Sequence, residues 1–169
     1  MLNALRRRKE YRLKAANLYA AVVERAREPV FFAIFGVKDT LDGRFDLIVL
    51  HVWLVLDRLK GGPLSQAFVD RVFVGFDEAL RELGAGDIGI GKRVKKFADA
   101  FYGRMQAYGE ATNEASMEAA LIRNLYRGEP DAGANALVRY ALRARERLVD
   151  CDVDAGQLDF GPPPEEVTR

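Results

Sequence analysis

The sequence contains almost none of the residues that cross-link small proteins. It has one cysteine, Cys151, and one histidine, His51, among 169 residues. A single cysteine excludes an internal disulfide, and these two residues are too few soft ligands for a structural zinc site. A chain of this length can bury a sufficient core without either kind of cross-link. We therefore expect a reducing compartment and a fold held together by packing.

The chain also lacks an excess of charge of either sign. Its 26 Lys and Arg residues balance 25 Asp and Glu residues, which leaves a formal net charge of +1. This balance argues against a surface built wholly for nucleic acid, and we expect no DNA partner. With 49% hydrophobic and 30% charged residues, the composition is that of one soluble globular domain.

The alternating pattern typical of strands is nearly absent, and apolar residues recur at helical spacing instead. We predict an all-α fold, a single-domain multi-helix bundle with short loops and an extended C-terminal tail. The predicted segments are 11–27, a short apolar piece at 31–37, then 44–60, 64–83, a helix ending near 108, 114–127, and a last helix that begins at 130–131.

The longest apolar run is too short to cross a membrane. Every residue of 47–56 except His51 is apolar, but Asp46 and Asp57 close the run, whereas a bilayer requires roughly 20 residues. We expect this helix to be the buried centre of the bundle. His51 is then expected to be buried and hydrogen-bonded rather than a general base, because its sequence neighbours are all hydrocarbon.

No pattern of catalytic residues stands out. Ser65 and Ser116 lie outside any nucleophile-elbow motif, and the acidic neighbours of Cys151 disfavour a reactive thiolate. The glycine-rich stretch 84–93 partly fits dinucleotide and phosphate-loop patterns, but a helix precedes it and Arg93 stands where a Ser or Thr would bind magnesium. We interpret the stretch as a connection between helices, with an NTPase as the minor alternative. We predict no catalytic residue, metal site or cofactor.

The two ends of the chain differ in charge. The N-terminus is basic and lacks the apolar core of a secretory signal. We interpret residues 1–9 as a basic arm or first helical turn, with contact to acidic lipid or RNA as the alternative. Residues 10–150 form the predicted helical domain, and 151–169 an acidic, proline-containing tail that is extended or disordered. The early basic residues are Arg6, Arg7, Arg8, Lys9, Arg12 and Lys14.

Two kinds of feature indicate a surface that binds another macromolecule. One basic strip at 92–96 starts the helix after the glycine stretch, and Arg139, Arg143, Arg145 and Arg147 form a second on the last helix. Such strips are usually solvated, but they also suit acidic lipid, RNA or acidic protein segments. Phenylalanines in the short apolar piece suggest an exposed patch for apolar polypeptide. The candidate partner-binding residues are Phe31, Phe32, Phe35, Lys92, Arg93, Lys96, Tyr102 and Arg104.

Short motifs between residues 29 and 108 occur in an order that resembles a known family. They are GVKDT at 36–40, GRFD at 43–46 ahead of His51, LRELG at 80–84, GDIG at 86–89, KRVKK at 92–96 and FYGR at 101–104. In their order and spacing they resemble the ubiquinol–cytochrome c chaperone family, which comprises assembly factors of respiratory complex III.

The resemblance implies a non-enzymatic helical chaperone that binds newly made cytochrome b and promotes assembly of ubiquinol–cytochrome c reductase. The partners it implies are nascent or unassembled cytochrome b, the ribosome, and the inner membrane as a peripheral contact. Lacking a convincing import sequence, the chain resembles a bacterial member that works in the cytoplasm at the inner face of the membrane. The basic helix faces leave a ribosome- or RNA-binding helical module as the alternative function.

Overall fold

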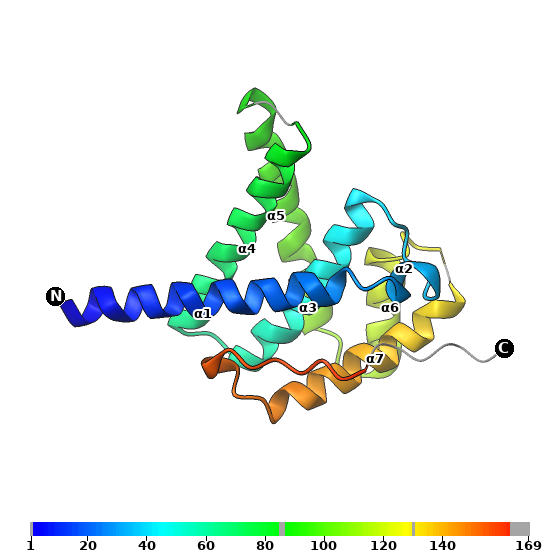
Figure 1. Cartoon of the computed structure of the whole chain (residues 1–169). Coiled ribbons are helices and arrows are strands. Elements are labelled where there is room, and N and C mark those ends of the chain that lie inside the picture. Colours follow the sequence, from blue (N-terminus) through cyan, green and yellow to red (C-terminus); the bar gives the residue numbers. More distant parts are fainter. Residues whose placement is uncertain (1, 85–86, 130, 163–169) are drawn as a thin grey trace.

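The computed structural model describes residues 2–84, 87–129 and 131–162, and this part of the chain is helical and contains no strand (Figure 1). It confirms the predicted all-α, single-domain bundle. The elements are α1 (Leu2–Ala26), α2 (Val30–Ala33), α3 (Leu41–Leu59), α4 (Pro63–Glu82), α5 (Asp87–Gly109), α6 (Glu114–Asn124), α7 (Ala132–Val149) and a short 3-10 helix, η1 (Val153–Ala155).

Helix α3 is the centre of the bundle, as its apolar sequence predicts. Every side chain from Phe45 to Val55 is buried, and α1, α5 and α7 pack around it. Helix α4 packs mainly against α1 and α5. Among the described helices, none is both long and apolar enough to cross a membrane.

Thr40 and Gly43 fix the start of α3. The backbone N–H of Gly43 donates a hydrogen bond to the Thr40 Oγ1, at 3.1 Å, which caps the helix. A Cβ atom at Gly43 would lie only 1.9 Å from the backbone oxygen of Lys38. Glycine is therefore required at this position so that the preceding loop can fold back against the helix.

His51 is buried at the centre of the core in a chain of hydrogen bonds, as predicted. Its Nδ1 lies 2.7 Å from the Leu47 carbonyl oxygen and its Nε2 lies 2.7 Å from the Tyr140 hydroxyl, which also accepts from Arg25 Nε at 2.9 Å. These contacts are all satisfied when Nδ1–H donates to Leu47 and the Tyr140 hydroxyl donates to Nε2. Burial lowers the pKa of His51 to about 4, so the imidazole is neutral at pH 7.

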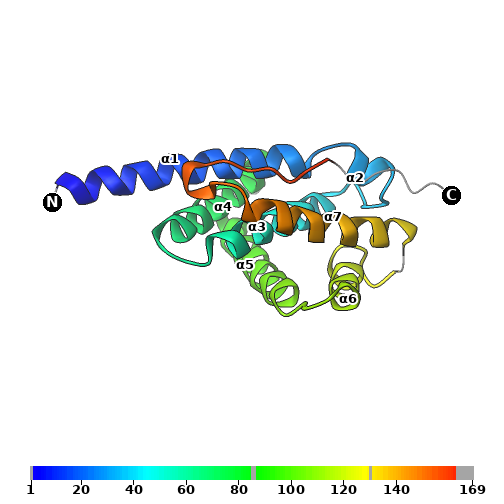
Figure 2. The same ribbon diagram turned by 90° about the horizontal axis from the view of Figure 1, so that it is seen from below.

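Helix α1 begins much earlier than the sequence pattern predicts. The apolar period predicts a start at residue 11, but the helix runs from Leu2, and all side chains from residue 3 to residue 10 are exposed. In Figures 1 and 2 this end of α1 projects beyond the other helices. Apolar residues do not recur at helical spacing there because that end of the helix has little core to face. The intrinsic helix propensity of its residues extends the helix instead.

The glycine-rich stretch is shorter as a loop than predicted. Residues 85 and 86 lie outside the described part, but α5 already begins at Asp87, so Gly89 and Gly91 are helical. Gly84 has a φ of +77° after α4, as expected for a residue that ends a helix.

The segment after α7 packs against the body of the protein. It is extended, as predicted, but Val153 and Phe160 are buried, and Figure 2 shows the segment running alongside α1 and α7. Arg25 Nη2 donates to the Gly161 carbonyl oxygen at 2.7 Å, and Arg147 pairs with Asp159. Apart from η1, residues 151–162 thus follow the extended alternative of the prediction, and residues 163–169 lie outside the described part.

Candidate functional site

The predicted exposed phenylalanine patch is wrong for two of its three residues. Phe31 and Phe35 are fully buried, and the Phe31 ring packs edge-on against the rings of His51 and Tyr140. Phe32 is half-buried, with the Arg44 guanidinium 5.9 Å from its ring centroid. The error has a physical reason: the short helix α2 turns Phe31 into the space between the longer helices, and Phe35, just after that helix, is enclosed as well.

The basic strip on α5 borders a groove, which we call the α3–α5 groove. Its volume is about 310 Å³. The aliphatic and aromatic part of its wall comes from α3, α4 and α5, and its charged part includes three of the predicted partner-binding residues. The lining residues are Leu41, Asp42, Phe45, Leu80, Arg93, Lys96, Phe97, Ala100, Arg104 and Arg127.

Arg104 lines the α3–α5 groove, but its charge is used within the protein. Its side chain is 12% exposed, and its Nη2 lies 2.7 Å from Oδ1 of Asp46, a residue with no exposed surface. Arg127 reaches the other carboxylate oxygen of Asp46, also at 2.7 Å. Arg104 therefore compensates a buried carboxylate on α3, and its contact with a partner stays a prediction.

The buried carboxylate makes this region electrostatically unusual. Burial raises the pKa of Asp46 to about 6, although both arginines act in the opposite direction. Tyr108 is buried nearby, and its hydroxyl has no hydrogen-bond partner among the described residues. Burial, and then the charge of Asp46, raise the pKa of that hydroxyl far above its ordinary value.

The remaining basic candidates on α5 divide into two groups. Arg93 and Lys96 line the groove and are exposed, whereas Lys92 and Lys95 are exposed on the same helix outside the groove. Tyr102 is 58% exposed, and its ring packs on Phe101 away from the groove lining. The α3–α5 groove thus brings together Arg93, Lys96 and Arg104 but leaves Lys92 and Tyr102 outside.

The second predicted basic strip, on α7, is partly neutralised. Arg145 makes two hydrogen bonds to Asp57, at 2.8 and 3.1 Å, and Arg147 pairs with Asp159. Two of its four arginines therefore have acidic partners. This weakens the expectation that α7 offers a continuous basic face to RNA.

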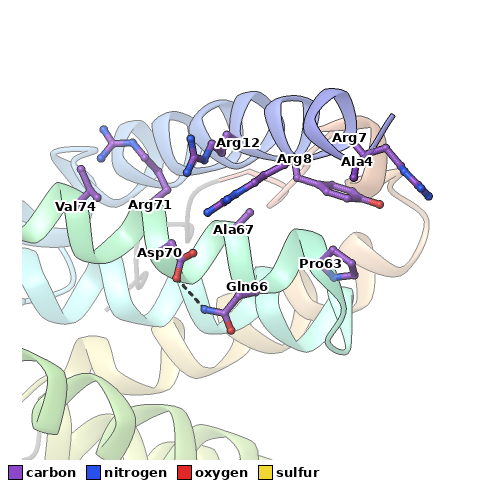
Figure 3. A pocket seen from close by; sticks show the side chains of 11 residues that line it. Ala4, Arg7, Arg8, Arg12, Pro63, Gln66, Ala67, Asp70, Arg71 and Val74 are labelled. Carbon is purple, nitrogen blue, oxygen red and sulfur yellow. Dashed lines mark hydrogen bonds between the residues drawn. The ribbon is translucent and has the colours of Figure 1, made fainter. Parts of the chain in front are cut away.

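A second groove, which we call the α1–α4 groove, lies between the first halves of α1 and α4 (Figure 3). Its volume is about 830 Å³. Arg8 extends from α1 into the space between the helices, and Asp70 accepts from Gln66 at 2.8 Å. The lining residues are Ala4, Arg7, Arg8, Tyr11, Arg12, Pro63, Gln66, Ala67, Asp70, Arg71 and Val74.

The α1–α4 groove carries more positive than negative charge. Arg71 is engaged by Glu78 at 3.1 Å and lies over the Tyr19 ring. Arg7, Arg8 and Arg12 have no ion pair with any residue in the described ranges. The sequence identified Arg7 and Arg8 as part of a basic arm and Arg12 as an early basic residue, but it contained no signal that α4 would complete a groove beside them.

The polar residues that the sequence offered as candidates for catalysis have structural contacts in the described part of the chain. No three His, Cys, Asp or Glu side chains gather there as a metal site would require. The Ser65 hydroxyl donates to the Gly61 carbonyl oxygen at 2.9 Å, and His51 is enclosed in the core. The glycine stretch follows helix α4 rather than a strand, so it lacks the context of a phosphate loop.

Comparison with known proteins identifies relatives of this chain. A family model described as "Ubiquinol-cytochrome C chaperone" matches residues 33–155. The crystal structure of the Cbp3 homologue from Brucella abortus is similar, with 37% identity and a TM-score of 0.75 over 94% of this chain and 100% of that chain.

Curated relatives carry a consistent name. The ubiquinol-cytochrome-c reductase complex assembly factor 1 of Xenopus laevis is 25% identical over 127 residues, which cover 71% of this chain and 64% of that protein. The Homo sapiens protein of the same name is 25% identical over 122 residues, covering 68% of this chain and 41% of that protein. The chain thus spans less than two thirds of the length of these relatives.

Proposed function

The chain belongs to the ubiquinol–cytochrome c chaperone family, and we propose that it is an assembly chaperone that binds newly made cytochrome b and promotes assembly of ubiquinol–cytochrome c reductase. The observation that carries this proposal is the family match over residues 33–155. The matched range includes α3, α4 and α5, which line the α3–α5 groove. The names of the curated relatives as reductase assembly factors support the same function.

We propose that the α3–α5 groove is where the client is held. An unassembled membrane subunit exposes apolar side chains that water solvates poorly. The exposed Leu41 and the half-buried Phe97 and Ala100 offer such side chains an apolar surface. Arg93 and Lys96 at its border attract carboxylates that flank an apolar segment. This is the usual pattern of helix-in-groove recognition.

The proposed activity requires binding and release but no reaction. The buried, neutral His51 and the hydrogen-bonded Ser65 support a role without catalysis. We place the chaperone in the cytoplasm, at the inner face of the membrane, where the ribosome delivers cytochrome b. The membrane and ribosome contacts are part of the proposal.

Deletion of the gene in its host tests the proposal. We expect assembled ubiquinol–cytochrome c reductase to fall strongly on native gels while the transcripts of its subunits stay unchanged. The haem b signal in reduced-minus-oxidised spectra of membranes should fall in parallel, and reintroducing the gene should restore both. Unchanged amounts of assembled reductase in the deletion strain would remove the proposal.

A further inference from the structure

The projecting end of α1 has an outer surface that the proposed client site does not use. All side chains from residue 3 to residue 10 are exposed, and Leu5 and Leu13 are 60% and 65% exposed. These two large aliphatic side chains lie on the end of α1 that projects from the body (Figure 1), where they are open to a partner of suitable chemistry.

The helical period places these leucines among positive charges. At about 100° per residue, Leu5 and Leu13 are separated by about 80° around α1, and Lys9 lies midway between them. Arg12 borders Leu5 and Arg6 borders Leu13 on the two outer sides. We call this surface, formed by Leu5, Arg6, Lys9, Arg12 and Leu13, the α1 basic face.

The nearest acidic residue, Glu10, borders this face. It lies about 40° around the helix from Arg6, and on its far side it pairs with Lys14 at 2.9 Å, which offsets its charge. The next arginines, Arg7 and Arg8, line the α1–α4 groove together with Arg12. Positive charge is therefore continuous from the α1 basic face into the groove.

We infer that the α1 basic face binds the surface of an acidic phospholipid bilayer. Leu5 and Leu13 enter the interface between headgroups and acyl chains, and the surrounding Lys and Arg side chains meet the lipid phosphates. Arg8 and Arg12 extend this contact along the groove. The inference deepens the proposed location at the membrane and rests on the proposed function for that location alone.

The composition of the face favours lipid over RNA. Surfaces that bind single-stranded RNA interleave their positive charges with aromatic side chains on which bases stack. The exposed apolar residues here are leucines, and the nearest aromatic residue, Tyr11, is half-buried in the groove. Aliphatic side chains between cations are typical of helices that lie in a membrane interface.

Vesicle flotation with the full chain tests the inference. We expect binding to vesicles of equal parts phosphatidylcholine and phosphatidylglycerol, weakening as salt is added, and little binding to phosphatidylcholine alone. K9E/R12E should weaken binding at least about tenfold. L5S/L13S, which leaves the charge unchanged, should weaken it several-fold. Circular dichroism verifies that each variant remains folded.

The matched control reverses the charge of two exposed arginines on α7. R139E/R143E changes the net charge by the same amount and should bind acidic vesicles nearly as well as the unaltered chain. Equal losses in both charge variants, no effect of the leucine variant, or equal binding to neutral vesicles would overturn the inference. If polyuridylic acid displaced the protein from acidic vesicles and bound it more tightly than the vesicles do, the face would be assigned to RNA instead. None of these results depends on whether the chain promotes reductase assembly.

Discussion

Arg104 on α5 forms an ion pair with Asp46 on α3, with its Nη2 2.7 Å from a carboxylate oxygen that has no exposed surface. The two residues end separate sequence motifs, GRFD at 43–46 and FYGR at 101–104. Arg104 also donates to the Ala100 carbonyl oxygen at 3.0 Å, and its guanidinium lies over the Phe45 ring at 5.4 Å. The pair therefore joins the helices that form the floor of the α3–α5 groove.

Asp46 and His51 should give the stability of the protein opposite dependences on pH. The pKa of Asp46 is raised to about 6 in the folded protein, so between about pH 4 and 6 the folded state binds more protons and stability falls as pH rises. The pKa of His51 is lowered to about 4, so over a similar range the unfolded state binds more protons and stability rises with pH.

Single variants separate these two contributions. In D46N only the His51 contribution remains, so the free energy of unfolding should rise by about 3 kcal/mol between pH 4 and 6.5. In H51Q only the Asp46 contribution remains, so the free energy of unfolding should fall by a similar amount. The unaltered protein should change less than either. Urea unfolding followed by circular dichroism across this pH range measures the slopes. Parallel slopes in the two variants would contradict the assignment.

Replacing Gly43 by alanine should destabilise the protein. The added Cβ would meet the Lys38 backbone oxygen, so the loop before α3 must move, at a cost of about 1–3 kcal/mol. Gly103 provides the matched control, because it also lies within a helix but a Cβ added there would meet no other atom within 4 Å. G103A should raise stability by about 0.5–1 kcal/mol. The account of Gly43 fails if both alanine variants are equally stable in thermal unfolding.

Removing the Tyr140 hydroxyl should leave buried polar groups without partners. In Y140F, His51 Nε2 loses its hydrogen-bond donor and Arg25 Nε loses its acceptor, and we expect a loss of about 1–3 kcal/mol. Y102F removes the same hydroxyl from a side chain that is 58% exposed and should change stability little. Chemical denaturation compares the two; a negligible effect of Y140F would show that the network contributes no stability.

The segment after α7 should contribute to stability through Phe160. Its ring is buried and packs edge-on against His51, with centroids 5.1 Å apart. F160A should therefore cost about 3 kcal/mol, whereas P162A, at an exposed neighbouring position, should be close to neutral. Equal melting temperatures for F160A and the unaltered chain would mean that this segment does not form part of the core.

Charge reversal on α5 tests the proposed client site. R93E/K96E places acidic side chains at the α3–α5 groove and should reduce the amount of assembled reductase when it replaces the natural gene. K92E/K95E makes the same charge change on exposed residues of the same helix outside the groove and should support normal assembly. Equal assembly with both variants, at equal protein levels, would exclude the groove as the client site.

Sequence patterns predicted the fold more accurately than they predicted the binding surfaces. The period of apolar residues identified α3 as the buried centre and His51 as a core residue, because burial of one face leaves a direct trace in spacing. Burial of Phe31, in the four-residue helix α2, and of Phe35, just after it, could not be predicted, since the orientation of so short a segment depends on its neighbours. The pairing of Asp46 with Arg104 was likewise hidden, because contacts between distant segments leave no local pattern.

Capture of newly made cytochrome b tests whether this chain binds its proposed client before assembly. Cells that carry an affinity-tagged copy of this chain are given a short pulse of labelled amino acid, and the tagged protein is purified at once or after a chase. We predict that labelled cytochrome b copurifies after the pulse and declines during the chase as assembled reductase gains the label. Recovery of cytochrome b no greater than that of an unrelated membrane protein, at every time, would contradict it.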